Sequence, residues 1–496
     1  MRTGIVFIFL GWLILFLSAA LLLPMATALY YNEDSWIAFA ESALIGSIIG
    51  VALTTLIKGE KEMGHKEGFV VVAFAWLAAA ALGALPYWLS GGIPSYLDAY
   101  FEAMSGFTTT GSTILSEIEH LGKGLLLWRS ITQWLGGMGI IVLSLAILPI
   151  LGIGGMQLYK AEMPGPTKDK LAPRIQDTAR ILWGVYILLT AMETGLLMFA
   201  GLDFYEAINH AFTTLSTGGF STQNGSIADF NNPLVDYIIS FFMFVAGINF
   251  TLHYWLLRGH PVRIFKNEEF RFYALVTLCA VMLIMTANYF YNTYTNFADN
   301  LRYTLFQVCS IFTTAGFGTA DFDQWAPVCK LALVSLMFLG GMAGSTAGGI
   351  KNIRIIVFGK FTRMQINKLI HPRSVEAIKV DGQKVPQEVI QSILGFLALY
   401  VTVFILATLI VTAHNIDLIT GATAVIATLN NIGPGLAKVG PACHFGHLPG
   451  LTKIVLIICM VAGRLELYTI AVLAVPAFWK DLKPPVPSWH ARKTER

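Results

Sequence analysis

The sequence predicts an all-α integral membrane protein, in which two N-terminal helices precede four helix, pore-loop, helix repeats around a pseudo-fourfold pore. Three observations support this prediction. Long apolar runs recur along the 496 residues, of which 55% are hydrophobic and only 13% charged. Four short turns rich in Thr, Ser, Asn and Gly follow one another at intervals of about 100 residues. Most of the 33 Lys and Arg residues fall in alternate loops.

Apolar runs of about 20 residues are long enough to cross the hydrocarbon core of a bilayer as helices. About ten such runs are present, near residues 4–29, 36–57, 68–90, 125–151, 176–201, 232–257, 270–293, 329–360, 388–414 and 451–478. The first run contains Ala26-Thr27-Ala28, which resembles a signal-peptide cleavage site. Its apolar stretch is longer than a usual signal core, so we expect a retained helix.

The expected division of the chain follows these runs and the turns between them. Two N-terminal transmembrane helices and an inner loop occupy 1–67, and a cytoplasmic tail occupies 479–496. The four pore-loop repeats between them are predicted at 68–160 (repeat 1), 161–265 (repeat 2), 266–375 (repeat 3) and 376–478 (repeat 4).

The charge distribution predicts the orientation, because Lys and Arg near the ends of spans stay on the cytoplasmic side. With both termini in the cytoplasm, most basic residues lie on that side, in or near 58–66, 160–180, 258–271, 351–384 and 480–496. The opposite loops carry acidic residues such as Glu33, Asp34 and Glu206, which would concentrate cations at an external mouth. For most of these acidic residues, taken singly, an ordinary solvated loop is the better explanation.

A short apolar segment precedes each turn, near 97–107, 203–214, 299–311 and 416–428. These segments are too short to cross the bilayer and predict re-entrant half-helices. Non-helical backbone at membrane depth is tolerated only where protein buries it or where it lines water. Four related turns therefore predict one shared aqueous path.

The turns offer neutral oxygens to a cation that must lose its hydration shell, since a ring of backbone carbonyls can replace those waters. Glycine permits the positive φ that such a turn needs. None of the turns contains a carboxylate, Lys or Arg, which favours a monovalent over a divalent cation. The expected filter residues are Thr109, Thr110, Gly111, Thr217, Gly218, Gly219, Thr314, Ala315, Gly316, Asn431, Ile432 and Gly433.

The second long helix of repeat 3 contains five glycines within 340–349, and glycine destabilises a helix interior by roughly 1 kcal/mol per residue. We expect this helix to break and form a loop that obstructs ions below the filter, the alternative being a glycine packing seam. Arg464 should lie at a similar depth, where it would bond the loop carbonyls or repel cations. It would otherwise pair with Glu466 or extend toward the inner surface. The expected gate residues are Gly340, Gly341, Gly344, Ser345, Thr346, Gly348, Gly349 and Arg464.

These four turns and their flanking helices resemble the Trk/Ktr/HKT superfamily, and within it the membrane subunits of bacterial Trk potassium-uptake systems. The resemblance covers essentially the whole chain. It implies one filter glycine per repeat, potassium as the transported ion, and an intramembrane gating loop. It also implies a homodimer in the bacterial inner membrane, with a cytosolic TrkA-like nucleotide-binding subunit docked on its inner face. The basic segment 351–384 is a candidate docking surface.

Two other functions were considered. A proton- or sodium-coupled transporter of the same fold would use titrating carboxylates within its spans, and no chain of such carboxylates is evident. A membrane enzyme would need a catalytic motif, and HExxH, GxSxG and Walker sequences are missing. No cofactor is expected, and the five cysteines show no metal-ligand spacing, although a Cys329–Cys443 pair stays open. Polar residues within the membrane segments to which we assign no transport role are Glu193, His210, Asn249 and His253.

Overall fold

The computed structural model describes residues 3–58, 64–139, 175–374, 376–480 and 486–487. Helices account for most of these residues, and the described strands form two short antiparallel pairs. The pairs are β1 (Ile57–Lys58) with β4 (Val486–Pro487) and β2 (Lys379–Val380) with β3 (Gln383–Lys384). The predicted all-α class is therefore confirmed.

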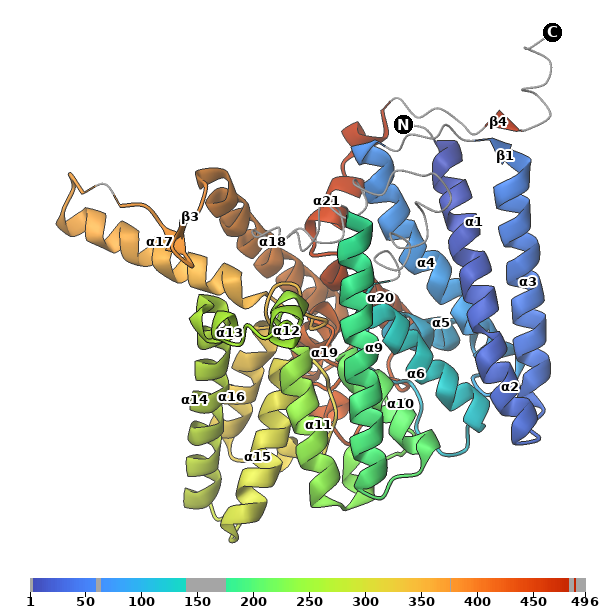
Figure 1. The fold of residues 1–496 in the computed structure, drawn as a ribbon, viewed down its shortest axis with the longest axis horizontal. Helices are drawn as coiled ribbons and strands as arrows, with labels where there is room; N and C mark the ends of the chain where they lie inside the picture. Colours follow the sequence, from blue (N-terminus) through green and yellow to red (C-terminus); the bar gives the residue numbers. More distant parts are fainter. Residues whose placement is uncertain (1–2, 59–63, 140–174, 375, 481–485, 488–496) are drawn as a thin grey trace.

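The N-terminal part is a compact group of long helices. The first two, α1 (Thr3–Ala20) and α2 (Leu22–Tyr30), form one apolar segment, and α3 (Ser35–Leu56) runs back beside α1. Glycine permits this close packing, because a Cβ atom at Gly11 would lie 2.9 Å from Leu53 Cβ on α3. Figure 1 shows these helices in blue at one edge of the molecule, next to α4.

The predicted repeats contain the remaining helices. Repeat 1 contains α4 (His65–Leu89), α5 (Tyr96–Phe107) and α6 (Lys123–Gly137), while repeat 2 contains α9 (Ile175–Phe199), α10 (Phe204–Leu215), α11 (Pro233–Ala246) and α12 (Phe250–Leu257). After the short α13 (Val262–Lys266), repeat 3 contains α14 (Glu268–Phe290), α15 (Phe297–Phe312), α16 (Pro327–Phe338) and α17 (Asn352–Ile370). Repeat 4 contains α18 (Gln387–Thr412), α19 (Leu418–Leu429), α20 (Gly450–Arg464) and α21 (Tyr468–Leu473). Short 3-10 turns occur at η2 (Ser226–Phe230), η3 (Phe322–Gln324), η4 (Ala437–Val439) and η5 (Pro476–Trp479).

The four short helices α5, α10, α15 and α19 coincide with the segments predicted to be re-entrant. Each begins at a side chain that accepts a hydrogen bond from a backbone N–H in the first turn, and such N-caps satisfy donors that the helix itself leaves unpaired. The capping residues are Ser95, Asp203, Asn296 and Asp417. A cap at the same place in every repeat fixes where each short helix starts.

The second long helices of repeats 2 and 4 differ from the continuous spans that the apolar runs predict, and that of repeat 3 is broken, as its glycines predict. Among the described residues, six helices are long and apolar enough to cross a membrane, and a seventh span exists only if α11 and α12, bent by 104°, are joined. In repeat 3 the helix stops at Phe338 and resumes at Asn352, and in repeat 4 it stops at Arg464. Part of the run at 125–151 lies outside the described residues. Where these helices are described, they are therefore interrupted near their middle.

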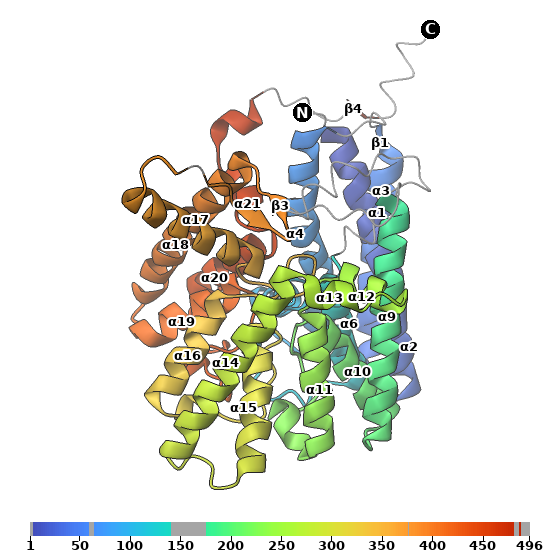
Figure 2. The ribbon, with the colours of Figure 1, turned by 60° about the vertical axis from the view of Figure 1, so that its left-hand side comes forward.

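The short helices and their partners close into a ring. Along the chain, α5 packs on α6, α10 on α11, α15 on α16 and α19 on α20. Between repeats, α6 packs on α10, α11 on α15, α16 on α19, and α20 returns to α5. Figure 1 shows α17 projecting away from this group, and Figure 2 shows α11 and α15 side by side.

A candidate ion pathway

The four predicted filter turns share one backbone conformation. Each short helix ends four residues before its glycine, and the chain then forms the same pair of hydrogen bonds, one from the first residue beyond the helix cap and one from the next. In repeat 1 these bonds run from Thr109 N to Gly106 O at 2.9 Å and from Thr110 N to Ser105 O at 2.8 Å. This is the Schellman arrangement, which requires a left-handed residue at its centre.

That left-handed residue is a threonine in three repeats and an asparagine in the fourth. The φ angles are 53° at Thr109, 54° at Thr217, 60° at Thr314 and 55° at Asn431. A β-branched residue rarely adopts such angles, and each instance costs on the order of 1–3 kcal/mol. Strain repeated in three equivalent turns indicates that the surrounding structure holds these turns for a functional reason.

The four filter glycines pack against one another's turns in a closed circle. A Cβ atom at Gly111, Gly219 or Gly316 would lie 2.0 to 2.1 Å from a carbonyl oxygen in the next repeat, and one at Gly433 would lie 3.0 Å from Thr110 O in repeat 1. The oxygens that the first three would meet belong to Gly218, Ala315 and Ile432. All four glycines have φ between 74° and 108°. Glycine is thus required at these positions for two reasons: the φ angle is positive, and no space is left for a Cβ atom.

The circle opens into a cavity of about 120 Å³. All four glycines, Gly111, Gly219, Gly316 and Gly433, line this mouth cavity, and so does the exposed Cys443. The 12 predicted filter residues lie in the turns that form this circle. Cys329 is buried and its sulfur lies 3.5 Å from the side-chain oxygen of Asn288. Both cysteines are free, so the open question of a Cys329–Cys443 pair is answered in the negative.

Side chains from the second helices support the turns from behind. The carboxamide of Gln133 donates to Gly218 O at 2.7 Å and accepts from Phe220 N at 3.0 Å, so it holds the backbone on both sides of Gly219. A Cβ atom at Gly136 would lie 1.8 Å from Phe107 O, which explains why this helix needs glycine there. Sequence reasoning missed Gln133, because nothing in its local sequence indicates a contact 85 residues away.

The glycine-rich segment between α16 and α17 is a loop packed under the filter. Met342 N donates to Gly247 O at 2.9 Å, and the hydroxyl of Thr346 donates to Leu215 O at 2.9 Å. Gly348 N donates to the Thr314 hydroxyl at 2.7 Å, which links the loop directly to the third filter turn. The loop therefore contacts the structures of repeats 2 and 3 that carry the filter.

Arg464 joins this loop to the opposite side of the ring. Its guanidinium group donates to Thr346 O at 3.0 Å, to Gly137 O at 3.0 Å and to Gly136 O at 2.5 Å. The bond to a loop carbonyl, which is one of the alternatives considered, is present at Thr346 O. Glu466 forms an ion pair with Arg354 on α17.

Glu269 joins the loop to the first turn of α17, and it was also missed. One oxygen of its buried carboxylate accepts from Ala343 N at 2.8 Å and from Ile353 N at 2.9 Å. A carboxylate at the start of an apolar span was the only signal in the sequence for Glu269.

Asn249, to which we assigned no transport role, also lies beside the loop. It caps α12, and its side-chain oxygen would lie 3.0 Å from a Cβ atom at Gly344.

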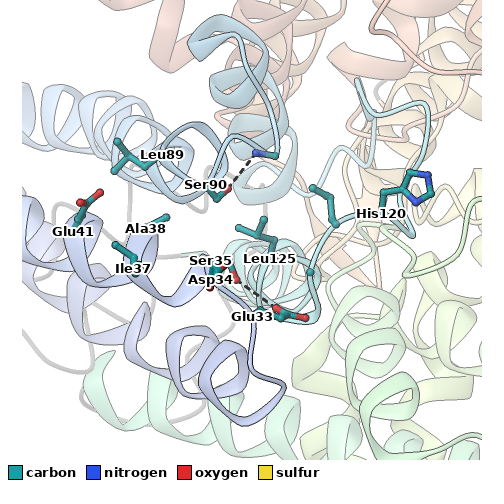
Figure 3. Close-up of a pocket in the computed structure, with 13 residues that line it drawn as sticks. Glu33, Asp34, Ser35, Ile37, Ala38, Glu41, Leu89, Ser90, His120 and Leu125 are labelled. Atoms are coloured by element: carbon teal, nitrogen blue, oxygen red, sulfur yellow. Dashed lines mark hydrogen bonds between the residues drawn. The ribbon is translucent and has the colours of Figure 1, made fainter.

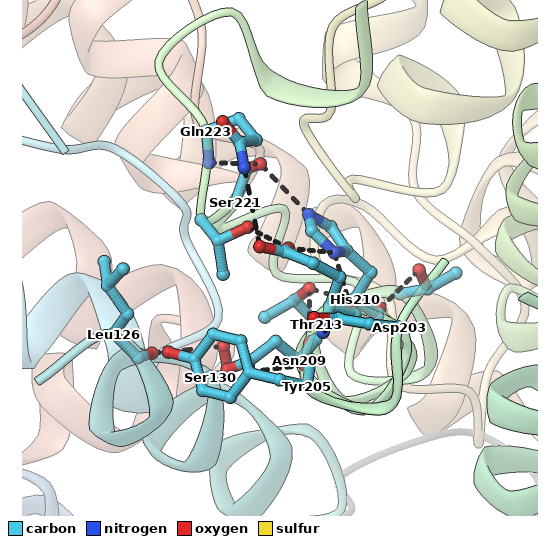
Figure 4. Close-up of polar contacts among 12 residues, drawn as sticks. Leu126, Ser130, Asp203, Tyr205, Asn209, His210, Thr213, Ser221 and Gln223 are labelled. Carbon is cyan, nitrogen blue, oxygen red and sulfur yellow. Dashed lines mark hydrogen bonds and ion pairs between the residues drawn. The ribbon is translucent and has the colours of Figure 1, made fainter. Parts of the chain in front are cut away.

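The other polar residues without an assigned role are buried. His253 lies within hydrogen-bonding distance, 2.9 Å, of Val245 O, and Glu193 is fully buried in α9. His210 on α10 reaches the segment that follows the second filter turn, where its Nε2 atom lies 3.0 Å from the Ser221 hydroxyl (Figure 4). His210 therefore contacts the segment that follows the second turn, although no role was expected for it.

A second cavity of about 510 Å³ lies away from the filter, between the α2–α3 turn and the segment leading into α6 (Figure 3). Glu33, Asp34 and Glu41 line it. Glu33 accepts from the backbone N–H groups of Lys123 and Gly124 at 2.6 and 3.0 Å, at the start of α6. This carboxylate thus stabilises a helix N-terminus, where negative charge is favoured.

Comparisons with known proteins agree with this geometry. A protein-family model for TrkH, described as a cation transport protein, matches residues 37–481. The chain is 40% identical over 475 residues to the Trk system potassium uptake protein TrkH of Escherichia coli strain K12, covering 95% of this chain and 98% of that protein. It is 34% identical to TrkG of the same strain, covering 95% and 97%. The crystal structure of the potassium transporter TrkH from Vibrio parahaemolyticus matches with a TM-score of 0.87 and 35% identity, covering 97% of this chain and all of that one.

Proposed function

The chain belongs to the TrkH family of cation transport proteins, and we propose that it is the potassium-conducting membrane subunit of a Trk-type uptake system. The observation that carries the proposal is the closed circle of four glycine turns, each packed against a carbonyl of the next repeat. Such a circle can present backbone oxygens to an ion on its axis. It is a transporter and not an enzyme.

The filter residues act through their backbone oxygens in this proposal. The turns contribute no charged side chain, so an ion is selected by the cost of dehydration and by its fit to neutral oxygens. The short helices direct their C-terminal, partially negative ends at the turns, which favours a cation and disfavours an anion. We assign K⁺ as the transported ion and no resident cofactor.

The loop between α16 and α17 acts as the gate, held by Arg464. In the structure the loop bonds to Thr314 above it and to Arg464 beside it. Opening requires that the contacts from Arg464 to Thr346 O, and to the carbonyls of Gly136 and Gly137, be exchanged or broken. The guanidinium charge also raises an electrostatic barrier while it stays near the pathway.

The family and the charge pattern support the assembly that we propose. The chain is a multi-pass protein of the bacterial inner membrane, and both termini lie in the cytoplasm in our proposal. The division into two N-terminal helices and four repeats, with the boundaries given above, describes the pore. The active unit is a homodimer, and a cytosolic TrkA-like nucleotide-binding subunit controls the gate from the inner face, with 351–384 as its docking surface.

Flux measurements with purified protein in liposomes test the function. Vesicles loaded with K⁺ and diluted into low K⁺ should take up a tracer cation, and K⁺ outside should compete far better than Na⁺. Protein-free vesicles and vesicles with heat-inactivated protein are the controls. Flux that requires a pH or Na⁺ gradient in place of a K⁺ gradient would favour the alternative, a coupled transporter of the same fold.

A further inference from the structure

Each short helix carries a side chain that reaches past its own filter turn and holds the segment that follows. In repeats 1 to 3 this residue stands nine positions before the filter glycine, and in repeat 4 it stands ten before. The four residues are Glu102, His210, Gln307 and Thr423. Their partners follow the glycine by two to four residues: Ile114 N at 2.9 Å, Ser221 at 3.0 Å, Thr319 with Ala320, and Leu436 N at 3.0 Å.

We call each of these contacts a clamp. The clamp of repeat 1 contains an ion pair between a carboxylate and an arginine, whereas in repeat 2 the Nδ1 atom of His210 lies 3.6 Å from the Glu206 carboxylate. Glu102 is fully buried and Arg129 on α6 is 1% exposed. The Glu102 carboxylate accepts from the Thr113 hydroxyl at 3.0 Å, from Ile114 N at 2.9 Å, and from Arg129 at 2.9 Å. Hydrogen bonds to charged groups are the strong ones, and this carboxylate receives several.

Arg129 also contacts the next repeat, at the segment that follows its filter turn. It donates to Ser221 O at 2.9 Å, and its guanidinium carbon lies 4.1 Å from the centre of the Phe220 ring. Phe220 and Ser221 directly follow the filter glycine of repeat 2. One buried ion pair thus sets the positions of the chain beyond two filter turns, Gly111 and Gly219.

The pair also controls charge at the mouth. Arg129 lines the mouth cavity together with the four filter glycines. A cation approaching the filter meets the guanidinium group, and the Glu102 carboxylate cancels that positive charge. Removal of either partner leaves the other buried and uncompensated, which is strongly unfavourable.

We propose that the Glu102–Arg129 ion pair is a positioning element that determines selectivity, through the segments after Gly111 and Gly219. This inference rests on the proposed potassium-conducting function. The ion pair keeps the neighbouring carbonyls at the spacing that suits K⁺, and it keeps the mouth electrically neutral. The remaining three clamps use uncharged side chains for the same task.

The Glu102→Gln substitution tests both roles. The amide keeps one acceptor oxygen but turns its NH₂ group toward the donors of Arg129 or Ile114. We expect the K⁺/Na⁺ flux ratio to fall about tenfold, the size expected for one lost hydrogen bond to a charged group. We also expect the half-saturating external K⁺ concentration to rise, because the charge of Arg129 is no longer cancelled. Arg129→Gln should lower the flux ratio too, while its half-saturating concentration should fall, since negative charge remains.

Asp236 and Arg302 provide a matched control. They form another buried ion pair, at 2.6 Å, between α11 and α15, and neither lines the mouth cavity. Asp236→Asn should lower the thermal unfolding temperature as Glu102→Gln does, but leave the flux ratio unchanged. If Glu102→Gln does not fold, Arg129→Lys is the second test, because lysine keeps the positive charge but lacks the planar guanidinium group that donates to both Glu102 and Ser221. This variant should lower the K⁺/Na⁺ flux ratio with little change in the half-saturating K⁺ concentration.

The outcomes separate the two proposals. If the wild type is K⁺-selective and the Glu102→Gln and Arg129→Lys variants keep its flux ratio, the role of the Glu102–Arg129 pair in selectivity is refuted. The proposed potassium-conducting function is then unaffected. Equal losses of selectivity in Glu102→Gln and Asp236→Asn would also refute that role, since any buried ion pair would then suffice. A folded wild type that does not distinguish K⁺ from Na⁺ would overturn the proposed function and the clamp together.

Discussion

The backbone N–H of Gly348 donates a hydrogen bond of 2.7 Å to the side-chain hydroxyl of Thr314. Thr314 is the left-handed residue of the third filter turn, and Gly348 belongs to the loop that breaks the helix beneath it. Filter and loop are therefore in direct contact, and a movement of the loop changes what the filter turn can bond. Four predictions follow from this and the neighbouring contacts.

Gly316→Ser should degrade potassium selectivity. Its φ is +82°, and a Cβ atom would lie 2.0 Å from Ile432 O, so the side chain must displace the turn of repeat 4. The conformation alone costs roughly 1–2 kcal/mol for an L-residue. The K⁺/Na⁺ flux ratio in liposomes should fall while total cation flux persists.

Gly318→Ala is the control for that substitution. A Cβ atom at Gly318 meets only Ser226 Cβ at 4.0 Å, an ordinary contact. Its flux ratio should equal that of the wild type. A wild-type ratio in Gly316→Ser would show that this turn does not take part in selection.

Arg464→Ala should raise K⁺ flux in the absence of any cytosolic partner, because the loop loses its bond at Thr346 O and the pathway loses a positive charge. Arg464→Lys separates the two effects, since it keeps the charge but cannot reach three carbonyls in the same way. High flux in both variants identifies the bonds as the restraint, and high flux in Ala alone identifies the charge. Unchanged flux in Arg464→Ala would refute a role in closing the pathway.

Glu269→Ala should loosen the loop, because the N–H groups of Ala343 and Ile353 lose a shared acceptor. An unsatisfied buried N–H costs about 1–3 kcal/mol. Amide hydrogen exchange in residues 340–350 should become faster and basal flux should rise. Glu269→Gln retains an acceptor oxygen and should stay close to the wild type in both measurements. Equal exchange rates in all three proteins would contradict the anchoring role.

Chemical modification of Cys443 should test whether the mouth cavity is the outer entrance of the ion pathway. Cys443 is exposed and lines the mouth cavity, whereas Cys279 on α14 is exposed but does not line that cavity, and Cys309, Cys329 and Cys459 are buried. A positively charged, membrane-impermeant thiol reagent added to the outside should modify Cys443 and lower K⁺ flux, because the attached cationic group repels K⁺ at the entrance. Cys443→Ala protein should be insensitive to the reagent. Modification only from the cytoplasmic side would reverse the proposed orientation.

The four glycine turns and the break between α16 and α17 could be predicted from the sequence because they depend on local chemistry. The turns combine glycine with small polar residues at four equivalent places, and the five glycines near Gly344 are incompatible with a continuous helix. These features need no knowledge of what packs against them.

The rest depends on contacts between distant segments. The bend between α11 and α12 occurs in a sequence that is apolar enough for one continuous span, and the apolar run predicted at 451–478 is broken after Arg464. Hydrophobicity alone therefore predicted the wrong shape for both. Gln133 and Glu102 act on partners across the ring or past their own turn, and His210 was set aside because polar residues in membrane helices are more often packing contacts. Only the closed ring shows which side chains face the filter.

The reversal potential of the purified wild-type protein in a planar bilayer, with K⁺ on one side and Na⁺ on the other, tests the central claim most directly. The account predicts a cation current whose reversal potential lies far from zero, on the side that opposes K⁺ flow down its gradient. In Gly316→Ser this reversal potential should move toward zero. A current that reverses at zero in the wild type, or no cation current with the gate contact at Arg464 removed, would contradict a potassium-selective pathway through the four turns.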